Sequence, residues 1–199
     1  LKLADQGFQI YLAEKSEKLG GLAKQLIKTL EGNDVQAFVS ELIEKVQNHP
    51  KIQIFTRALI VDHSGMPGMF KTGMQSGPQM FYRQIEHGVT ILATGSISNR
   101  PSQYLLDQSA AVRTQLETQK FIYENPEAVK NWENVVMIQC VGSRTVENPN
   151  CSRICCQNAI KNALAIVEIN PNARVFVLYR DMRTYGFAMA LIAVVGLSC

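Results

Sequence analysis

The chain has 199 residues, 46% of them hydrophobic and 19% charged, which is typical of a globular protein with one large domain or parts of two. The formal net charge of +3 is small and the basic residues are scattered, so nucleic-acid binding has no support. Four of the five cysteines lie between positions 140 and 156, unlike the spread cysteines of a secreted disulfide scaffold. We therefore expect a reducing, cytoplasmic setting.

The two ends of the chain are unusual. The first residues carry no initiator Met and no signal-peptide pattern, and they begin inside a predicted helix, so we infer an N-terminally truncated chain. Residues 187–199 are almost continuously apolar but too few to cross a bilayer, which takes about 20 residues. We expect no membrane span and interpret this tail as a buried strand or helix rather than a membrane contact.

The first half of the chain alternates predicted helices and strands. A helix ends near Gly7, an apolar strand covers residues 8–13, and an amphipathic helix covers residues 34–48. Short strands are expected at 52–54 and 58–61, a glycine- and methionine-rich hairpin or loop at 64–78, and an apolar strand at 86–96. His63 and His87 lie near strand edges, where we expect them to be structural rather than metal ligands.

Three features of this half are those of a dinucleotide-binding fold. Glu14, followed by Lys15, stands at the end of the strand 8–13, where an acidic residue hydrogen-bonds the hydroxyls of an adenosine ribose. Glycines at 20 and 21, and Thr94-Gly95 within ILATG, allow a ligand to approach the backbone closely. Each feature alone is weak evidence, because an exposed loop glutamate or a turn glycine explains it equally well. The prediction of a dinucleotide-binding fold rests on the order of the three features along the chain.

A second unit follows a predicted boundary near residue 125. Pro126 and the polar run after it separate residues 1–125 from residues 126–199. Residues 135–140 predict a buried strand, residues 153–169 a helix and residues 174–179 another strand, which is the start of a second βαβ unit. Asp181 follows the last strand much as Glu14 follows its own. The fold class is therefore α/β, a partial Rossmann-like domain followed by the start of another.

Four cysteines, Cys140, Cys151, Cys155 and Cys156, bracket this second strand, loop and helix with the spacing C-x10-C-x3-C-C. The segment CVGSRT lies where a glycine-rich phosphate loop would normally be, but does not match G-x-G-x-x-G. Four thiolates from a loop and a helix end suit a [4Fe–4S] cluster, and the amino end of a helix favours thiolate. Zinc, thiol–disulfide redox chemistry and buried unliganded cysteines remain alternatives.

These segments resemble one family, the A subunit of heterodisulfide reductase, an iron–sulfur flavoprotein with a thioredoxin-reductase-like core. The resemblance covers residues 1–187 and rests on LADQGFQIYLAEKSEKLGG, HGVTILATGS, VVMIQCVGSR, CSRICCQNAIKNAL and VLYRDMRTYGF. The pair CVGSR and CSRICC is the most specific part. Residues 1–125 would correspond to a partial FAD-binding domain that lacks its N-terminal glycine-rich loop, and residues 126–199 to a partial second unit with the cysteine motif.

The resemblance implies an oxidoreductase subunit that passes electrons between FAD and [4Fe–4S] clusters. Glu14 and Lys15 would lie at the adenosine ribose, Gly20 and Gly21 near the flavin, and Thr94-Gly95 against the cofactor, while the four cysteines would ligate a cluster. Its partners would be the other subunits of such a complex and an electron donor such as a hydrogenase, a dehydrogenase or a ferredoxin. The fragment alone would be inactive. The alternative function is a zinc-stabilised structural or docking module without a redox role.

Overall fold

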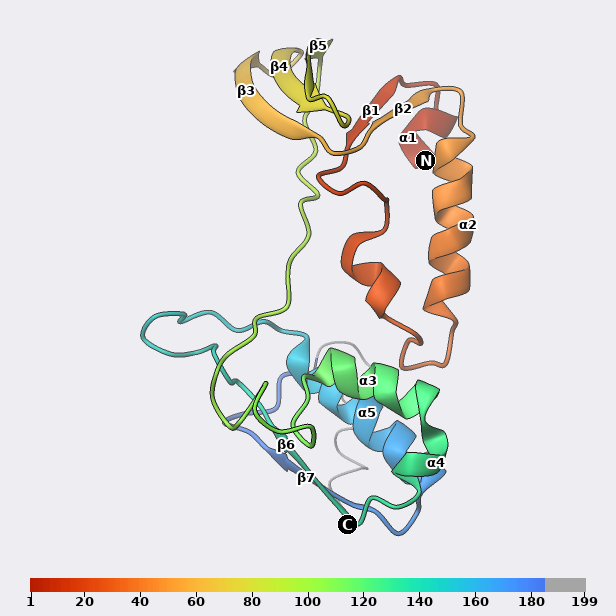
Figure 1. Ribbon diagram of the computed structural model, residues 1–199. Helices are drawn as coiled ribbons and strands as arrows, with labels where there is room; N and C mark the ends of the chain where they lie inside the picture. Colours follow the sequence, from red (N-terminus) through yellow and green to blue (C-terminus); the bar gives the residue numbers. More distant parts are fainter. Residues whose placement is uncertain (185–199) are drawn as a thin grey trace. The chain divides into compact units, whose positions relative to one another are not determined.

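The computed structural model describes residues 1–184, which form two compact units (Figure 1). The first contains residues 1–24 and 31–97, and the second contains residues 25–30 together with the chain from Ser98 onward. The division at residue 97 falls earlier than the boundary predicted near residue 125, because the helix that ends at Glu124 packs inside the second unit. Within the described residues, no helix combines the length and apolar character needed to cross a membrane. The apolar tail from residue 187 lies outside them.

The first unit begins with a parallel β–α–β arrangement. A short helix α1 (Lys2–Asp5) precedes strand β1 (Ile10–Ala13), and a 3-10 helix η1 (Gly21–Gln25) and helix α2 (Val35–Gln47) lead to strand β2 (Ile52–Phe55). Strands β1 and β2 pair in parallel from Ile10 opposite Ile52 to Ala13 opposite Phe55. Helix α2 starts at Asp34 because the carboxylate of this N-cap residue accepts a hydrogen bond from the backbone N–H of Ala37 at 2.9 Å.

A three-stranded antiparallel sheet follows in the same unit. It has the order β3 (Leu59–Met66), β4 (Met69–Ser76) and β5 (Phe81–His87), joined by tight turns. Its inner residue Met74 packs with Phe55 and Ala58 in a small buried cluster. The hairpin predicted at 64–78 is confirmed as the connection between β3 and β4 together with β4 itself.

The strand predicted at 86–96 is wrong. Strand β5 ends at His87, and residues 88–97 have no regular structure. The apolar side chains of this segment are exposed, with Val89 at 75% and Leu92 at 84%. Among the described residues no strand pairs with the segment, so its backbone groups have no sheet to join and its side chains have no face to cover.

The second unit contains the other parallel β–α–β arrangement. Helices α3 (Gln115–Glu124) and α4 (Pro126–Val129) come first, followed by strand β6 (Asn134–Ile138), helix α5 (Cys155–Ile169) and strand β7 (Arg174–Leu178). Strands β6 and β7 pair in parallel, from Asn134 opposite Arg174 to Ile138 opposite Leu178. The strand, helix and strand predicted after residue 134 are confirmed, and so is the α/β fold class, since each unit carries a parallel strand pair.

One hydrophobic core joins the helices and strands of this unit. Its fully buried members come from α3, α4, β6 and α5 and include Ile122, Val129, Met137, Ala159 and Ile166. Side chains alternate along β6 and β7, so that Val135, Met137, Val175 and Val177 point toward this core and their neighbours are exposed. The helix α5, which begins at Cys155, is therefore fixed along its length by apolar contacts.

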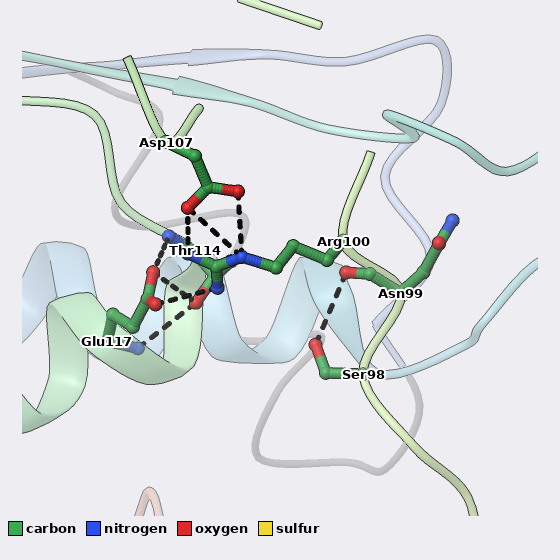
Figure 2. A network of polar contacts seen from close by, with 6 residues as sticks. All are labelled: Ser98, Asn99, Arg100, Asp107, Thr114 and Glu117. Atoms are coloured by element: carbon green, nitrogen blue, oxygen red, sulfur yellow. Dashed lines mark hydrogen bonds and ion pairs between the residues drawn. The ribbon is translucent and has the colours of Figure 1, made fainter. Parts of the chain in front are cut away.

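Polar contacts hold the segment that enters this unit. Figure 2 shows the guanidinium of Arg100 between the carboxylates of Asp107 and Glu117. Glu117 also forms a capping box with Thr114: its carboxylate accepts from the Thr114 backbone N–H at 2.8 Å, and the Thr114 hydroxyl accepts from the Glu117 N–H at 3.2 Å. The start of α3 and the preceding loop are thus tied together.

Candidate cysteine site and nucleotide-binding residues

The cysteines predicted as ligands lie where strand β6 ends and helix α5 begins. Cys140 follows β6 by two residues, Cys155 and Cys156 open α5, and Cys151 lies in the loop between them. All four are free thiols; Cys156 is 3% exposed and the other three are half-buried. The helix start predicted near residue 153 is confirmed at Cys155, which puts the adjacent pair in the first turn.

A buried glutamine joins the two ends of this junction. The Gln139 amide, next to Cys140, donates to the backbone carbonyl of Cys155 at 3.0 Å, and the residue is only 8% exposed. Its backbone N–H continues the β6–β7 ladder by donating to Leu178 at 2.9 Å. Gln139 therefore holds Cys140 beside the start of α5. Sequence analysis did not single it out, although a polar side chain directly after an apolar strand was the available signal.

The loop after Cys140 has an unusual backbone. Cys140, Gly142 and Arg144 have positive φ angles of 61°, 67° and 57°, whereas the residues between them do not. The loop closes on itself, because the Ser143 N–H donates to the Cys140 carbonyl at 3.2 Å and the Arg144 N–H donates to the Asn150 carbonyl at 3.3 Å. The Gly142 carbonyl accepts from Asn99 at 2.9 Å and from Asn148 at 3.0 Å, so side chains on both sides fix this conformation.

The thiols of Cys140, Cys155 and Cys156 lie close enough to influence one another. Burial raises the pKa of the Cys156 thiol, and the neighbouring charges of Cys155 and Cys140 raise it further. A hydrogen bond from the backbone N–H of Arg183 to Cys156 opposes the rise in this pKa. Burial of Cys156 therefore outweighs the effect of the helix terminus, which favours the thiolate. In the loop, the Cys151 sulfur accepts a hydrogen bond from the Arg153 N–H at 3.4 Å.

The donor set at this junction consists of cysteine thiols. Within residues 1–184, no three His, Cys, Asp or Glu side chains converge closely enough to surround one metal ion. A polynuclear cluster takes its thiolates at separate corners, so its ligands lie farther apart than those of a tetrahedral zinc ion. The four free thiols supply the ligand type that iron–sulfur clusters and structural zinc both take. Cys140, Cys151, Cys155 and Cys156 are thus the residues that could hold such a group.

The predicted nucleotide-binding residues all lie in the first unit. Glu14 directly follows β1, and its Oε1 accepts from the backbone N–H of Ser16 at 2.7 Å. Its backbone is fixed on both sides, since the N–H donates to Phe55 at 2.8 Å and the carbonyl accepts from Ala58 at 2.9 Å. The carboxylate thus stands at the carboxyl end of a parallel strand, the place that a ribose-binding acid occupies in dinucleotide folds. Lys15 beside it is exposed.

The glycines of the first unit differ in backbone conformation and in the space around them. Gly20 has a φ of 109°, and a Cβ there would lie 2.8 Å from the Lys24 side chain, so only glycine fits. Gly21 has a φ of 45° and open space around it. Thr94 and Gly95 are exposed in the segment 88–97, where Gly95 has a φ of 67° with nothing near its Cβ position. The backbone at Gly21 and Gly95 is therefore accessible to a ligand.

Two features lie apart from these residues. His63 and His87 both hydrogen-bond the Thr72 hydroxyl, at 2.7 Å and 2.8 Å, across the antiparallel sheet. A cavity of about 530 Å³ in the second unit lies beside α3, where the Arg113 guanidinium sits 4.2 Å from the Phe121 ring centroid. No cysteine and no predicted nucleotide-binding residue lines that cavity.

The fold and the site define an α/β protein with two parallel β–α–β arrangements, one of which carries a cysteine-rich junction. The chain is similar in sequence to the A subunits of several heterodisulfide reductases. It is 26% identical to the A subunit of the H2/formate:CoB-CoM heterodisulfide,ferredoxin reductase of Methanococcus maripaludis, over 94% of this chain and 42% of that protein. It is 24% identical to the iron-sulfur A subunit of the CoB–CoM heterodisulfide reductase of Methanocaldococcus jannaschii, with the same two coverages.

The A subunit of the ferredoxin:CoB-CoM heterodisulfide reductase of Methanosarcina mazei is also 24% identical, and this chain covers 35% of it. The chain thus spans well under half the length of these relatives. The alignment to the M. maripaludis protein runs over 275 residues, more than the whole chain contains, so that relative has additional residues inside the shared region. No family model matches the chain. An L-proline dehydrogenase from P. horikoshii superimposes with a TM-score of 0.45 at 16% identity, over 92% of this chain and 33% of that one.

Proposed function

We propose that this chain is part of an oxidoreductase subunit that transfers electrons between FAD and a [4Fe–4S] cluster in a heterodisulfide-reductase-like complex. The observation that carries the proposal is the junction of β6 and α5, where the Gln139 amide ties the strand end next to Cys140 to the Cys155 carbonyl at 3.0 Å and four free thiols lie between residues 140 and 156. The relation to the iron-sulfur A subunit of the M. jannaschii enzyme supports it.

The chain's own residues would do three things for the cluster. Cys140, Cys151, Cys155 and Cys156 would ligate it as thiolates, and Gln139 would keep the strand end and the helix start together. Burial of Cys156 would exclude water from one side. A bound cluster would supply one-electron transfer, at a potential set by its surroundings.

The first unit would bind FAD. Glu14 would accept hydrogen bonds from the adenosine ribose, helped by Ser16, whose N–H holds one carboxylate oxygen in place. Lys15 would lie beside it, and the backbone at Gly20, Gly21, Thr94 and Gly95 would approach the cofactor closely. The protein's share in such chemistry is to position the cofactor and tune its electronics.

The partners would be the other subunits of such a complex and an electron donor. The names of the relatives point to hydrogen, formate and ferredoxin as reactants of those enzymes. For this chain we propose a hydrogenase, a dehydrogenase or a ferredoxin as the donor, acting in the cytoplasm.

Anaerobic purification of the 199-residue chain, followed by reconstitution with iron and sulfide, tests the cluster. We expect about four irons and four sulfides per chain, as a [4Fe–4S] cluster requires, a broad visible absorbance that bleaches on reduction, and loss of both in Cys156→Ser. Cys199→Ser is the matched control, since it changes a thiol in the same way outside the proposed ligand set. One zinc and no iron would instead support the structural module, and a titratable thiol pair in metal-free protein would support thiol–disulfide chemistry.

A further inference from the structure

An arginine–carboxylate bridge connects the cysteine loop to the segment after β7. The Arg144 guanidinium pairs with the Asp181 carboxylate, 37 positions away in the chain, and the Arg144 side chain is only 22% exposed. The hydrogen bond with Asp181 raises the pKa of the guanidinium, and Cys140, four positions earlier in the chain, raises this pKa further. One side chain therefore joins the cysteine loop to the strand-end segment.

The other end of this bridge reaches a second cysteine. The second oxygen of Asp181 accepts from Arg183 Nε at 2.8 Å, and the backbone N–H of Arg183 donates to the Cys156 sulfur. The side-chain contacts thus run from Arg144 in the cysteine loop through Asp181 to Arg183, whose backbone lies near Cys156. Arg180 adds a further tie, because its guanidinium donates to the Arg144 carbonyl at 2.6 Å.

We propose that Arg144 and Asp181 are positioning residues of the cysteine site, which fix Cys140 and Cys156 relative to each other and set the charge beside their sulfurs. This inference rests on the proposed function for its effect on a cluster, but its geometric part concerns the chain alone. Outer residues of this kind hold ligands in place and tune a metal site.

The same contacts argue against a nucleotide at this strand end. Asp181 follows β7 as Glu14 follows β1, but both of its oxygens are engaged by arginines. The Glu14 carboxylate has one oxygen on a backbone N–H and is paired with no arginine among the described residues. Asp181 is therefore committed to the cysteine loop.

The net charge of this bridge should raise the reduction potential of a cluster at the cysteine site. Two guanidiniums face one carboxylate, which leaves a net positive charge beside the cysteine loop. Positive charge and hydrogen bonds to the ligand sulfurs stabilise the reduced, more negative state of a cluster, and so raise its reduction potential. Loss of Arg144 should therefore make the potential more negative.

Arg144→Gln tests the proposal, with Arg153→Gln as the matched control. Arg153 lies in the same loop, also with a positive φ, but its exposed side chain has no described hydrogen bond to a cysteine or a carboxylate. In the reconstituted chain we expect Arg144→Gln to shift the midpoint potential to more negative values and to lose the cluster in air at least severalfold faster. Arg144→Lys keeps the charge but not the planar guanidinium. Its midpoint potential should stay close to that of wild type, but it should still lose the cluster faster in air.

A measurement on metal-free protein tests the positioning role independently of the proposed cluster. Hydrogen–deuterium exchange of residues 140–150 should be at least severalfold faster in Arg144→Gln and in Asp181→Asn, and unchanged in Arg153→Gln. Equal exchange rates in wild type and all three variants would overturn the positioning role, whether or not iron is bound. If the wild-type chain takes up no iron but the exchange pattern holds, the cluster proposal fails while the bridge stands. Should Arg144→Gln fail to fold, Asp181→Asn carries the test, with a potential shifted in the opposite, positive direction.

Discussion

The Asn162 amide on α5 donates to Gln115 at the start of α3 twice, to its side-chain Oε1 at 2.7 Å and to its backbone carbonyl at 2.9 Å. Asn162 is 1% exposed, so these bonds form inside the core. They satisfy a carbonyl and a side-chain oxygen of Gln115 and lock α3 to the helix that begins with Cys155 and Cys156. Packing far from the cysteines thereby fixes the direction of their helix.

Replacing Asn162 with Ala should destabilise the second unit. The change removes the Asn162 donor from two oxygens of the half-buried Gln115, and an unsatisfied buried polar group costs about 1–3 kcal/mol. Urea unfolding measures the loss. Asn158→Ala on the same helix is the control, since no described side-chain bond is lost there, and an equal loss in the two variants would contradict the role of Asn162.

Replacing Ile166 with Ala should create a cavity in the same core. Ile166 is 0% exposed and packs with Ile122 and Val129, so we expect a loss of about 2–5 kcal/mol in the free energy of unfolding. Val167→Ala, next along the helix but 42% exposed, should cost far less. Similar unfolding midpoints for the two variants would show that this face of α5 is not buried.

The sequence predicted the helices and strands with the clearest periodicity and missed what depends on distant partners. Helices α2 and α5 were predicted because apolar residues recur on one face. The core covers that face of α5, whereas on α2 only Val39 is buried and Phe38 is 63% exposed, so the prediction that the whole α2 stripe is core is wrong. The strand expected at 86–96 fails because apolar character alone does not supply a neighbouring strand. The contact of Arg144 with Asp181 joins residues 37 positions apart, and no spacing rule anticipates it.

The capping box of α3 should make stability depend on pH. The hydrogen bond from the Thr114 N–H, followed by that from Arg100, holds the pKa of Glu117 below its usual value of 4.5. A carboxyl group with a lowered folded-state pKa stabilises the fold above the unfolded pKa, and this contribution is lost as the pH falls through the folded pKa. The difference in unfolding free energy between wild type and Glu117→Gln should therefore be largest above about pH 5 and shrink below pH 4.5.

Thr114→Ala provides the companion measurement. Removal of an N-cap hydroxyl should cost about 1 kcal/mol in unfolding free energy at neutral pH. Urea titrations at a series of pH values check both variants. Parallel pH profiles for wild type and Glu117→Gln would show that the carboxylate contributes nothing to the cap.

Replacing Gly142 with Ala should disturb the cysteine loop. The new Cβ would lie 2.4 Å from Asn99 Nδ2 at a φ of 67°, so Asn99 must move and its bond to the Gly142 carbonyl is lost. We expect lower iron content after reconstitution, because the conformation of the loop after Cys140 depends on this φ and on the bond to Asn99. Gly32→Ala, with a φ of 85° and nothing near its Cβ, has the same backbone strain outside the site and should keep its iron. Equal iron content in the two variants would show that iron binding does not depend on the conformation of this loop.

Glu14 should be decisive for flavin binding in the first unit. Glu14→Gln keeps the size of the side chain but removes the charge that would accept both ribose hydroxyls, and hydrogen bonds to a charged group contribute about 1.5–3 kcal/mol. The dissociation constant for FAD should therefore rise roughly tenfold to a hundredfold. Glu17→Gln is the control, because that carboxylate pairs with Arg57 at 2.9 Å and is 67% exposed. Fluorescence titration with FAD measures both, and an equal effect at the two positions would place the ribose elsewhere.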